Sequence, residues 1–460
     1  MNDSTPEFAN RDSKPQGEPS DPEASVPDST GRVLARCDEL ATITDEPGCI
    51  TRSYLSPAMG RVDDVVARWM TEAGLEAEQD GAGNLIGLRS CGREGAPVLV
   101  LGSHLDTVRD AGRYDGVLGV VLALAVVEEL GDEALPFDLE IVAFADEEGL
   151  RFGVPFLGSR ARIGELGGEV LERRDAAGIT LAHAIREFGG DPETLTCRYR
   201  GRHCLGYLEA HIEQGPWLEH CGRPLGVLEA LSGACWLQVG FEGQAGHAGT
   251  TPMELRRDAM PAAAELVLAA EREALADEAL VATVGKLAPS PGASNVIPGR
   301  VDLSLDVRHP DRARLTEAVE SLLACGEEIA RRRGLRFDYQ ILHRLDGVNA
   351  DPELSRLLDE AVAATGADPE RLVVGAGHDA LLMARRMGMT MLFLRSPGGI
   401  SHHPDEAVVP ADVTLAQRAM VGWVRRMAQA EVARHREGAW QPTPEATTGH
   451  GGETSLDLDG

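Results

Sequence analysis

The chain has 460 residues, which is too long for a single compact core and favours two domains. Its hydrophobic fraction of 43% and aromatic fraction of 4% are typical of an aliphatic α/β protein and exclude a disordered or fibrous one. With 74 acidic and 44 basic residues the formal net charge is −30, so nucleic acid and anionic membranes, which would repel the chain, are excluded as partners.

The chain begins with a stretch, 1–32, that is rich in Pro, Ser, Asp and Glu and poor in large apolar side chains. A disordered acidic tail is predicted there, because too little apolar surface is available to offset the entropy of folding. Apolar residues then recur every three or four positions over 33–40 and 59–73, which predicts two helices. The stretch 75–88 predicts a strand, a glycine-rich turn and a second strand.

Three apolar stretches predict buried strands of a parallel sheet, over 98–104, 139–145 and 391–395. Open α/β sheets carry their sites at the carboxyl ends of such strands. His104 ends the first strand, and Asp115 precedes an apolar helix predicted over 117–130. His402 follows the third strand. The three strands therefore deliver metal-ligating side-chain types to one edge of the sheet.

The second strand runs into three adjacent carboxylates, those of Asp146, Glu147 and Glu148. Neighbouring carboxylates at a strand end repel one another and are costly unless a positive charge holds them. A divalent metal ion would supply that charge. The alternative, that Glu147 and Glu148 cap a following turn of helix, explains neither Asp146 nor the convergence with His104.

A further strand, from Cys204 onwards, places Glu209, His211 and Glu213 on one face. That face is strongly polar and is not expected to point into an apolar core. From about residue 229 the pattern changes to a β-α-β-β-α-β order, the split ferredoxin-like sequence of elements. Its predicted strands and helices cover 234–242, 253–276, 280–287, 301–308, 312–333 and 335–341.

Helices predicted over 351–382 and 411–437 surround the strand 391–395 and complete the first domain. The predicted fold class is therefore α/β, with a mostly parallel mixed sheet flanked by helices, plus an inserted ferredoxin-like α+β domain. The predicted boundaries are 1–32 for a tail, 33–228 and 343–437 for the larger domain, 229–342 for the inserted domain and 438–460 for a second disordered tail.

The eight cysteines form no C-x-x-C pair, which favours reduced thiols in a cytoplasmic protein. No signal-peptide pattern and no apolar run of roughly 18 to 20 residues is present, so no association with a membrane is expected. The only lysines are Lys14 and Lys286. This acidic, lysine-poor composition indicates either a salt-adapted source or a GC-rich genome, and a titration of stability against salt separates the two.

Nine motifs occur in one order along the chain. They begin at Gly102 (GSHLDTV), Asp115 (DGVLG), Asp146 (DEEGLRF), Glu209 (EAHIEQGP), Gly246 (GHAGTTPM), Ser294 (SNVIPG), Asp306 (DVRH), Gly375 (GAGHDA) and Gly399 (GISH). Together they resemble the dinuclear metal-dependent amidohydrolases that include allantoate amidohydrolases, N-carbamoyl-L-amino-acid hydrolases and β-ureidopropionases, relatives of the aminoacylase and carboxypeptidase G type enzymes. The resemblance extends from about residue 35 to 437.

The resemblance implies two divalent metal ions per subunit, with Asp115 bridging them. The implied ligands are His104, Asp115, Glu148, His211 and His402. Imidazole and carboxylate ligands favour Zn²⁺, with Mn²⁺, Co²⁺ or Ni²⁺ as alternatives. Of the adjacent His402 and His403, the family motif selects His402.

The resemblance also implies that Glu147 is the general base and that Asp106 orients His104. His247 would donate a hydrogen bond to the developing oxyanion, in the active site of a partner subunit. The implied substrate contacts are Gln214, His247, Asn295, Arg308 and Gly399.

Arg308 would clamp a substrate carboxylate through its two-pronged guanidinium, the alternative being an ordinary surface arginine. Gly399 either presents a backbone amide to the substrate or merely turns the chain. His378 and Asp379 either contact and position the metal ligands or cap a helix, and the two alternatives are equal.

The implied function is hydrolysis of a C–N bond in a small, carboxylate-bearing ureido compound, either allantoate or an N-carbamoyl-L-amino acid. The inserted domain would serve as a lid and as the interface of a homodimer. His211 stands where peptidase relatives have a carboxylate, which favours the ureido branch over an aminoacylase or peptidase. A catalytically silent metal- or ligand-binding protein is the alternative from another class, and the intact Glu147 argues against it.

Overall fold

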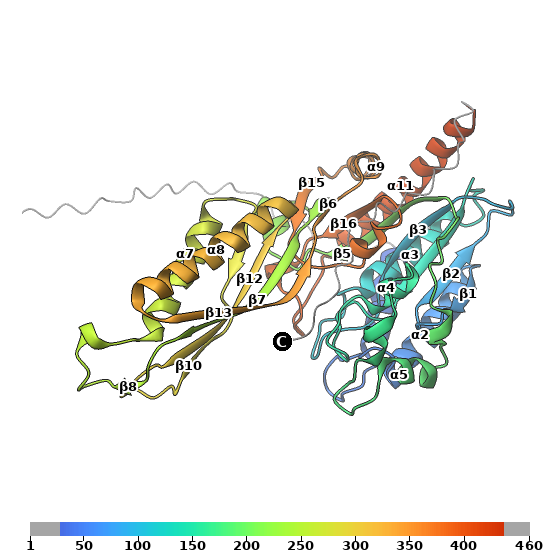
Figure 1. The fold of residues 1–460 in the computed structure, drawn as a ribbon. Helices are drawn as coiled ribbons and strands as arrows, with labels where there is room; N and C mark the ends of the chain where they lie inside the picture. Colours follow the sequence, from blue (N-terminus) through green and yellow to red (C-terminus); the bar gives the residue numbers. More distant parts are fainter. Residues whose placement is uncertain (1–27, 437–460) are drawn as a thin grey trace, which may run out of the picture.

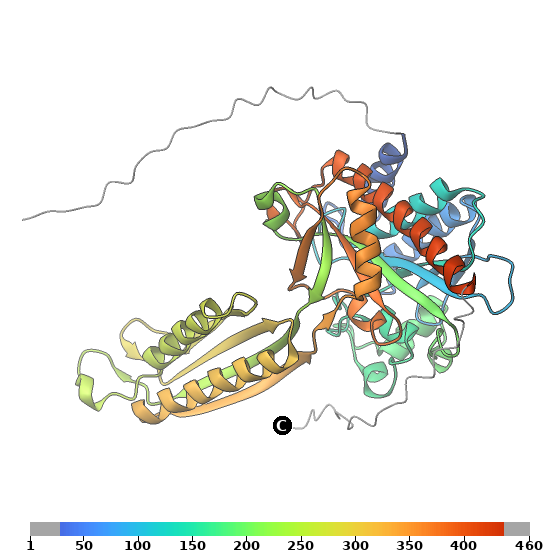
Figure 2. The same cartoon turned by 90° about the horizontal axis from the view of Figure 1, so that it is seen from above.

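The structure, a computed structural model, describes residues 28–436 (Figure 1). They form a larger body, built on a nine-stranded sheet, and a smaller one, built on a five-stranded sheet. The two bodies lie side by side in both views (Figures 1 and 2). The predicted tail 438–460, and most of the predicted tail 1–32, lie outside the described residues.

The sheet of the larger body has the order β1-β2-β4-β3-β5-β16-β6-β14, with β15 also paired to β6. Its strands are β1 Glu76–Gln79, β2 Leu85–Arg89, β3 Val98–His104, β4 Asp138–Phe144, β5 Cys204–Ile212, β6 Leu225–Leu231, β14 Val348–Asn349, β15 Glu370–Val374 and β16 Met389–Leu394. The central strands β4, β3, β5 and β16 run parallel to one another. They are buried over most of their length because helices cover both faces, and most of their side chains are apolar.

Helices of the larger body cover the two faces of this sheet. They are α1 Asp28–Ala41, α2 Pro57–Glu72, α3 Val117–Leu130, α4 Leu157–Arg162, α5 Leu181–Phe188, α6 Trp217–Cys221, α9 Pro352–Ala363, α10 Ala380–Met383 and α11 Pro410–Arg436, with short 3-10 turns η1 Gly168–Glu172, η2 Pro192–Thr194 and η4 Pro397–Gly399. Helices α1, α2, α3, α9 and α11 share one core with one face of the sheet, and α10 shares a second core with the other face. The predicted α/β class with a mostly parallel mixed sheet is confirmed.

The smaller body has an antiparallel sheet of order β10-β12-β7-β13, with β9 also paired to β12. Its elements are β7 Gly233–Glu242, η3 Met253–Leu255, α7 Ala259–Leu275, β9 Val281–Thr283, β10 Leu287–Ser290, β12 Arg300–His309, α8 Arg312–Arg333 and β13 Arg336–Leu345, and a separate pair is formed by β8 Gly246–His247 and β11 Val296–Ile297. Helices α7 and α8 cover one face of this sheet (Figure 2). Its proposed role as a lid, and the domain boundaries drawn from the sequence, stay predictions.

Two predictions of where a helix begins are wrong. Helix α1 begins at Asp28, inside the predicted tail 1–32, because Thr30 is buried and its hydroxyl lies 2.7 Å from that of Thr414 on α11. The helix predicted over 253–276 begins at Ala259, since Asp258 caps it by accepting a hydrogen bond from the Met260 N–H.

Two predictions that involve strands are wrong as well. The predicted strand 280–287 is two short strands, β9 and β10, and the predicted helical stretch 351–382 contains β15. Strand β6 was missed as well. Strand β15 pairs with β6, and β6 also pairs with β16 and β14; all three pairings join residues more than a hundred positions apart, which short-range periodicity does not report.

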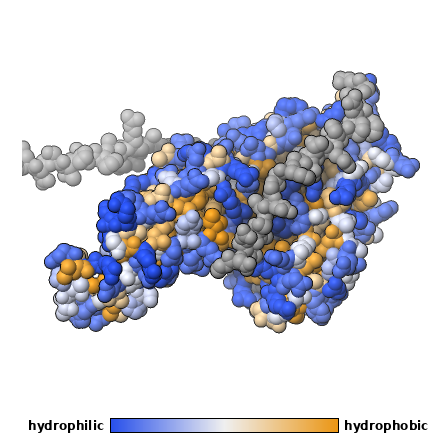
Figure 3. Space-filling view, viewed as in Figure 1, coloured by the Kyte–Doolittle hydropathy of each residue, from blue (hydrophilic) through white to orange (hydrophobic). Residues whose placement is uncertain are grey.

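The surface seen in Figure 3 is largely hydrophilic, with hydrophobic residues gathered in patches. No helix within residues 28–436 is long and apolar enough to cross a membrane. All eight cysteines fall within this range and none of them forms a disulfide there.

Candidate metal centre

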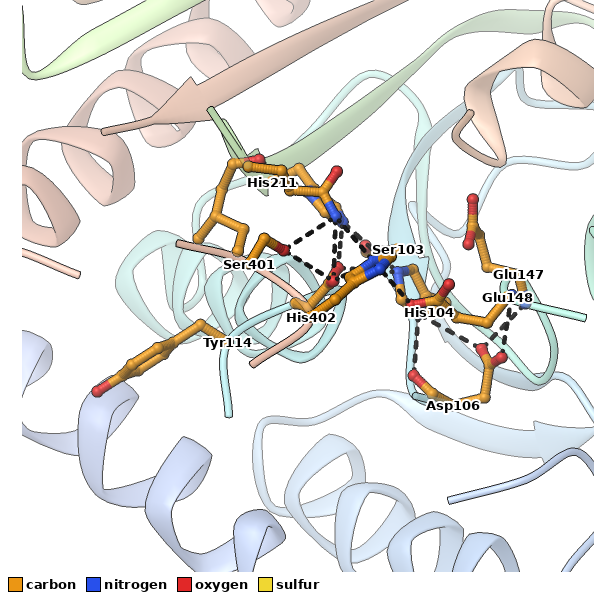
Figure 4. Close-up of polar contacts among 12 residues, drawn as sticks. Ser103, His104, Asp106, Tyr114, Glu147, Glu148, His211, Ser401 and His402 are labelled. Atoms are coloured by element: carbon orange, nitrogen blue, oxygen red, sulfur yellow. Dashed lines mark hydrogen bonds and ion pairs between the residues drawn. The ribbon is translucent and has the colours of Figure 1, made fainter. Parts of the chain in front are cut away.

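Polar side chains from four neighbouring parallel strands meet at one edge of the larger sheet. His104 ends β3, His211 lies on β5, Glu147 and Glu148 follow β4, and His402 follows β16. Because these strands are adjacent and parallel, their carboxyl ends meet. The three histidines point toward one another in Figure 4.

Asp115 lies in the turn before α3, at the centre of this group. The next residue, Gly116, has φ +68°, and a Cβ there would stand 2.4 Å from the His104 ring. Only glycine therefore lets the turn bring Asp115 against the imidazole.

The two carboxylate oxygens of Asp115 face two different sets of side chains. Oδ1 lies 3.1 Å from His211 Nε2 and 3.6 Å from His104 Nε2. Oδ2 lies 3.1 Å from His402 Nε2, which is itself 3.5 Å from Glu148 Oε1. Within each set the ligand atoms lie within 4.8 Å of one another. The two oxygens of Asp115 therefore face two separate groups of side chains that could hold a metal ion.

The exposed neighbour His403 does not join this group. Its Nδ1 accepts a hydrogen bond from the N–H of Asp405 at 3.1 Å and lies 3.7 Å from that residue's carboxylate. The geometry therefore agrees with the choice of His402 made from the motif.

Three carboxylates of this group lie close together and away from solvent, so their negative charges oppose one another. Burial, and then the neighbouring Glu148, raise the pKa of Glu147 well above its usual range. Burial and the charge of Asp115 raise the pKa of Glu148 to about 7. Burial opposes ionisation of Asp115 too, but hydrogen bonds from the three histidines hold its pKa well below the usual range. A divalent cation would relieve this crowding, and imidazole with carboxylate is a donor set that such cations accept.

Asp106 holds the two glutamates and one histidine in place. Its Oδ1 accepts from the Glu147 N–H at 3.0 Å and its Oδ2 from the Glu148 N–H at 3.1 Å. His104 Nδ1 lies 3.4 Å from Asp106 Oδ1. No helix begins directly after the two glutamates, because α4 begins only at Leu157, but a turn follows them, closed by a hydrogen bond from the Gly153 N–H to the Gly149 carbonyl. The alternative that the glutamates cap this turn stays a prediction.

Glu209 and His211 on β5 are both buried, but in polar surroundings. Glu209 accepts hydrogen bonds from the hydroxyls of Ser103 at 3.2 Å and Tyr207 at 3.1 Å. His378 packs edge-on against His211, with ring centroids 4.5 Å apart. Asp379 makes no capping hydrogen bond to α10, so the capping alternative for this pair is wrong.

Glu406 is a site residue that the sequence did not reveal. Its Oε1 accepts from the N–H groups of Tyr114 at 2.8 Å and Asp115 at 3.1 Å, and Ser401 donates to its Oε2 at 3.4 Å. Only 4% of the residue is exposed. Its partners lie about 290 positions earlier in the chain, and nothing in the local pattern around Glu406 indicates this contact.

A cavity of about 240 Å³ opens beside this group, between the two bodies. The five candidate ligands and Glu147 line it, together with Gln214 and Arg308. Gln214 donates through Nε2 to Asp115 Oδ2 at 3.0 Å. Arg308 comes from β12 of the smaller body, and its guanidinium donates to Asp306 Oδ2 at 2.7 Å and to the Gly375 carbonyl at 2.6 Å.

Three of the predicted substrate contacts do not line this cavity. His247 and Asn295 lie together at the β8–β11 pair, where the Ala248 N–H donates to the Asn295 carbonyl. Gly399 ends η4, and its N–H donates to the Ser396 carbonyl. Their roles in substrate binding stay predictions.

Comparison with known proteins places these features in context. The model of peptidase family M20/M25/M40 matches residues 100–426. The chain is 37% identical over 404 residues to an N-carbamoyl-L-amino acid amidohydrolase of Geobacillus stearothermophilus, covering 87% of this chain and 99% of that protein. It is also 37% identical over 426 residues to an allantoate deiminase of Arabidopsis thaliana, covering 85% and 81%. A solved amidase of the hydantoinase/carbamoylase family from Burkholderia multivorans superposes with a TM-score of 0.82 at 32% identity, covering 87% and 98%.

Proposed function

The chain belongs to peptidase family M20/M25/M40, and on that premise we propose that it is a metal-dependent amidohydrolase acting on a linear ureido substrate, allantoate or an N-carbamoyl-L-amino acid. The bond cleaved is a C–N bond that is not a peptide bond. The observation that carries the proposal is the carboxylate of Asp115, whose two oxygens face separate sets of ligand side chains. The names of the relatives supply the substrate class.

In this proposal two divalent cations bind per subunit, one to each set. The ligands are His104 and His211 on one side, Glu148 and His402 on the other, and Asp115 between them. Zn²⁺ is favoured, with Mn²⁺, Co²⁺ and Ni²⁺ as alternatives. When bound, the ions would polarise the scissile carbonyl and lower the pKa of the attacking water.

Glu147 is the general base of the proposed reaction. It takes a proton from the attacking water and passes it to the leaving nitrogen, so that the amine departs neutral. Burial raises the pKa of Glu147, which lets its carboxyl group hold the proton between the two transfers. Asp106 fixes the backbone of Glu147 and the ring of His104 at the same time.

Arg308 and Gln214 hold the substrate in the cavity. The guanidinium pairs with the substrate carboxylate, and the amide of Gln214 reaches the ureido group beside Asp115. His247, Asn295 and Gly399 complete the contacts when the smaller body closes as a lid, with His247 entering from the partner of a homodimer formed through that body. The exposed position of His247, outside the cavity of its own chain, supports this arrangement.

The proposed function is tested by assaying the metal-loaded protein on allantoate, several N-carbamoyl-L-amino acids, β-ureidopropionate and an N-acetylated amino acid. Release of ammonia or amine from a ureido compound is the expected result, with activity lost on chelation and recovered with added metal. Turnover of the N-acetylated compound alone would instead identify an aminoacylase or peptidase. A metal-loaded protein that hydrolyses none of them would contradict the proposed function.

Replacing Arg308 by Lys is expected to lower kcat/KM on a carboxylate-bearing ureido substrate by about 10- to 100-fold, mainly through KM, because a charged, forked hydrogen bond is lost. Steady-state kinetics measures this. Arg300→Lys is the matched control, since Arg300 lies on the same strand and pairs similarly with Asp302 at 2.7 Å, but does not line the cavity. If the two substitutions lower kcat/KM equally, the proposed binding of the substrate carboxylate by Arg308 is contradicted.

Replacing Glu406 by Gln is expected to weaken metal binding by about 10- to 100-fold, as is common when a partner that orients a ligand is altered. The reason is that the uncharged amide oxygen holds the backbone N–H groups of Asp115 and of the residue before it less strongly than the carboxylate of Glu406 does. Competition with a chelator of known affinity measures the change. Asp405→Asn, at an exposed neighbour, serves as control, and unchanged affinity in the Glu406 variant would contradict the role given to it.

A further inference from the structure

The sheet of the smaller body presents one face to its own helices and the other to the cavity. On β12, Leu305 and Val307 are buried beneath α7 and α8. The alternating residues Asp306 and Arg308 therefore lie on the opposite face. Arg308, which lines the cavity, identifies this as the cavity face.

The neighbouring strand β7 continues this face with apolar residues. Ala234 pairs with Arg308, and Trp236 pairs with Asp306, so both belong to the cavity face. Trp236 lines the cavity with 40% of its surface exposed. A tryptophan left this open beside a candidate active site is available to a ligand.

Strand β13 adds to the same wall on the other side of β7. A bulge between Ile341 and His343 shifts the register, so that His343 pairs with Trp236 and Leu345 with Ala234. The rings of Trp236 and His343 have centroids 5.2 Å apart. Both His343 and Leu345 line the cavity. The result is an aromatic and aliphatic wall that borders Arg308.

We propose, on the basis of the function given above, that Trp236, His343 and Leu345 form a subsite for the side chain of an N-carbamoyl-L-amino acid, and that the substrates are those with a large apolar or aromatic side chain. Arg308 and Trp236 are diagonal neighbours on one sheet face, a spacing of roughly 7 to 8 Å that long side chains bridge. The carboxylate and the side chain of a single amino acid leave the same carbon atom. One substrate molecule therefore reaches both residues.

Allantoate fits this wall less well, because it carries a second ureido group in place of the apolar side chain. That group would bring a carbonyl and several N–H groups out of water and against the indole ring, which costs free energy unless each finds a partner. The wall offers few polar atoms to such a group: Trp236 has one indole N–H, and Nε2 of His343 is buried and has no hydrogen-bond partner among the described residues.

The test compares the metal-loaded parent with Trp236→Ala on N-carbamoyl-L-phenylalanine, N-carbamoylglycine and allantoate. The parent is expected to favour the phenylalanine compound over the glycine compound. Trp236→Ala is expected to lower kcat/KM for the phenylalanine compound by about 10-fold or more, and for the glycine compound by less than about twofold, because only the first contacts the ring. Trp236→Phe, which keeps an aromatic ring, is expected to retain most of the preference.

Trp217→Ala is the control, because Trp217 is 49% exposed but does not line the cavity. It should leave the ratio between the two compounds unchanged. Circular dichroism and intact metal content of each variant show that it has folded.

A loss of equal size on both compounds in Trp236→Ala, or a parent that prefers allantoate, would overturn the subsite while leaving the ureido hydrolase in place. Failure of the metal-loaded parent on every ureido compound would overturn both.

Discussion

Replacing Glu147 by Gln is expected to lower kcat by about 100- to 10,000-fold, the usual contribution of a positioned general base. The amide keeps the size of the side chain but has no basic oxygen pair to receive the proton of the attacking water. Because Glu147 lies in neither set of ligands that share Asp115, the metal content of the variant should equal that of the parent. Steady-state kinetics and elemental analysis on one preparation measure both quantities.

Glu169→Gln provides the control, since Glu169 is exposed on η1 and distant in sequence from every candidate ligand. It should be as active as the parent. A Glu147 variant with parental kcat would contradict the general-base role. Loss of metal together with activity would show instead that Glu147 is a ligand, because its carboxylate lies near the imidazole of His104 and the carboxylate of Glu148.

Replacing Asp115 by Asn is expected to reduce both the metal content and the activity, with a loss in kcat/KM of at least about 1,000-fold, or ~4 kcal/mol of transition-state stabilisation. The amide has one oxygen in place of two and no charge, so it can no longer serve both sets of ligands. Asp115 also interacts with three imidazoles. Burial acts to raise the pKa of Asp115, but hydrogen bonds from these imidazoles hold it well below the usual value. The substitution therefore disturbs both halves of the centre.

The measurement is metal content after dialysis against metal-free buffer, alongside activity on the ureido substrate found in the parent. Asp132→Asn is the control, since Asp132 is exposed just beyond the other end of α3. An Asp115 variant that keeps the parental metal content would show that the two sets do not share this carboxylate.

Part of the candidate centre could be predicted from the local pattern, because some of its side chains stand where an apolar strand ends; the full set of ligands, with Asp115 and His211, came from the resemblance of the motifs to a known family. His104 after β3 and the carboxylates after β4 are of this kind. The parallel order of these strands then brings their ends together. Local pattern and global topology agree at these positions.

Other parts of the site depend on contacts that no local pattern reports. Glu406 holds the turn of Asp115 from the opposite end of the chain, and β15 is a strand only because it pairs with β6. Trp236 shows the same limit: the alternation along β7 predicts its face, but the side chain reaches the cavity only because the smaller body lies against the larger one. His247, Asn295 and Gly399 were singled out by motif, and the structure does not bring them to the cavity of the same chain.

The proposed metal centre has Asp115 between two cations. Anomalous X-ray scattering from crystals of the metal-loaded protein, recorded at the absorption edge of the bound metal, tests this directly. Two peaks are predicted, one against His104 and His211 and the other against Glu148 and His402, with the carboxylate of Asp115 touching both. A single peak, or a peak beside Glu209 and His378 instead, would contradict it.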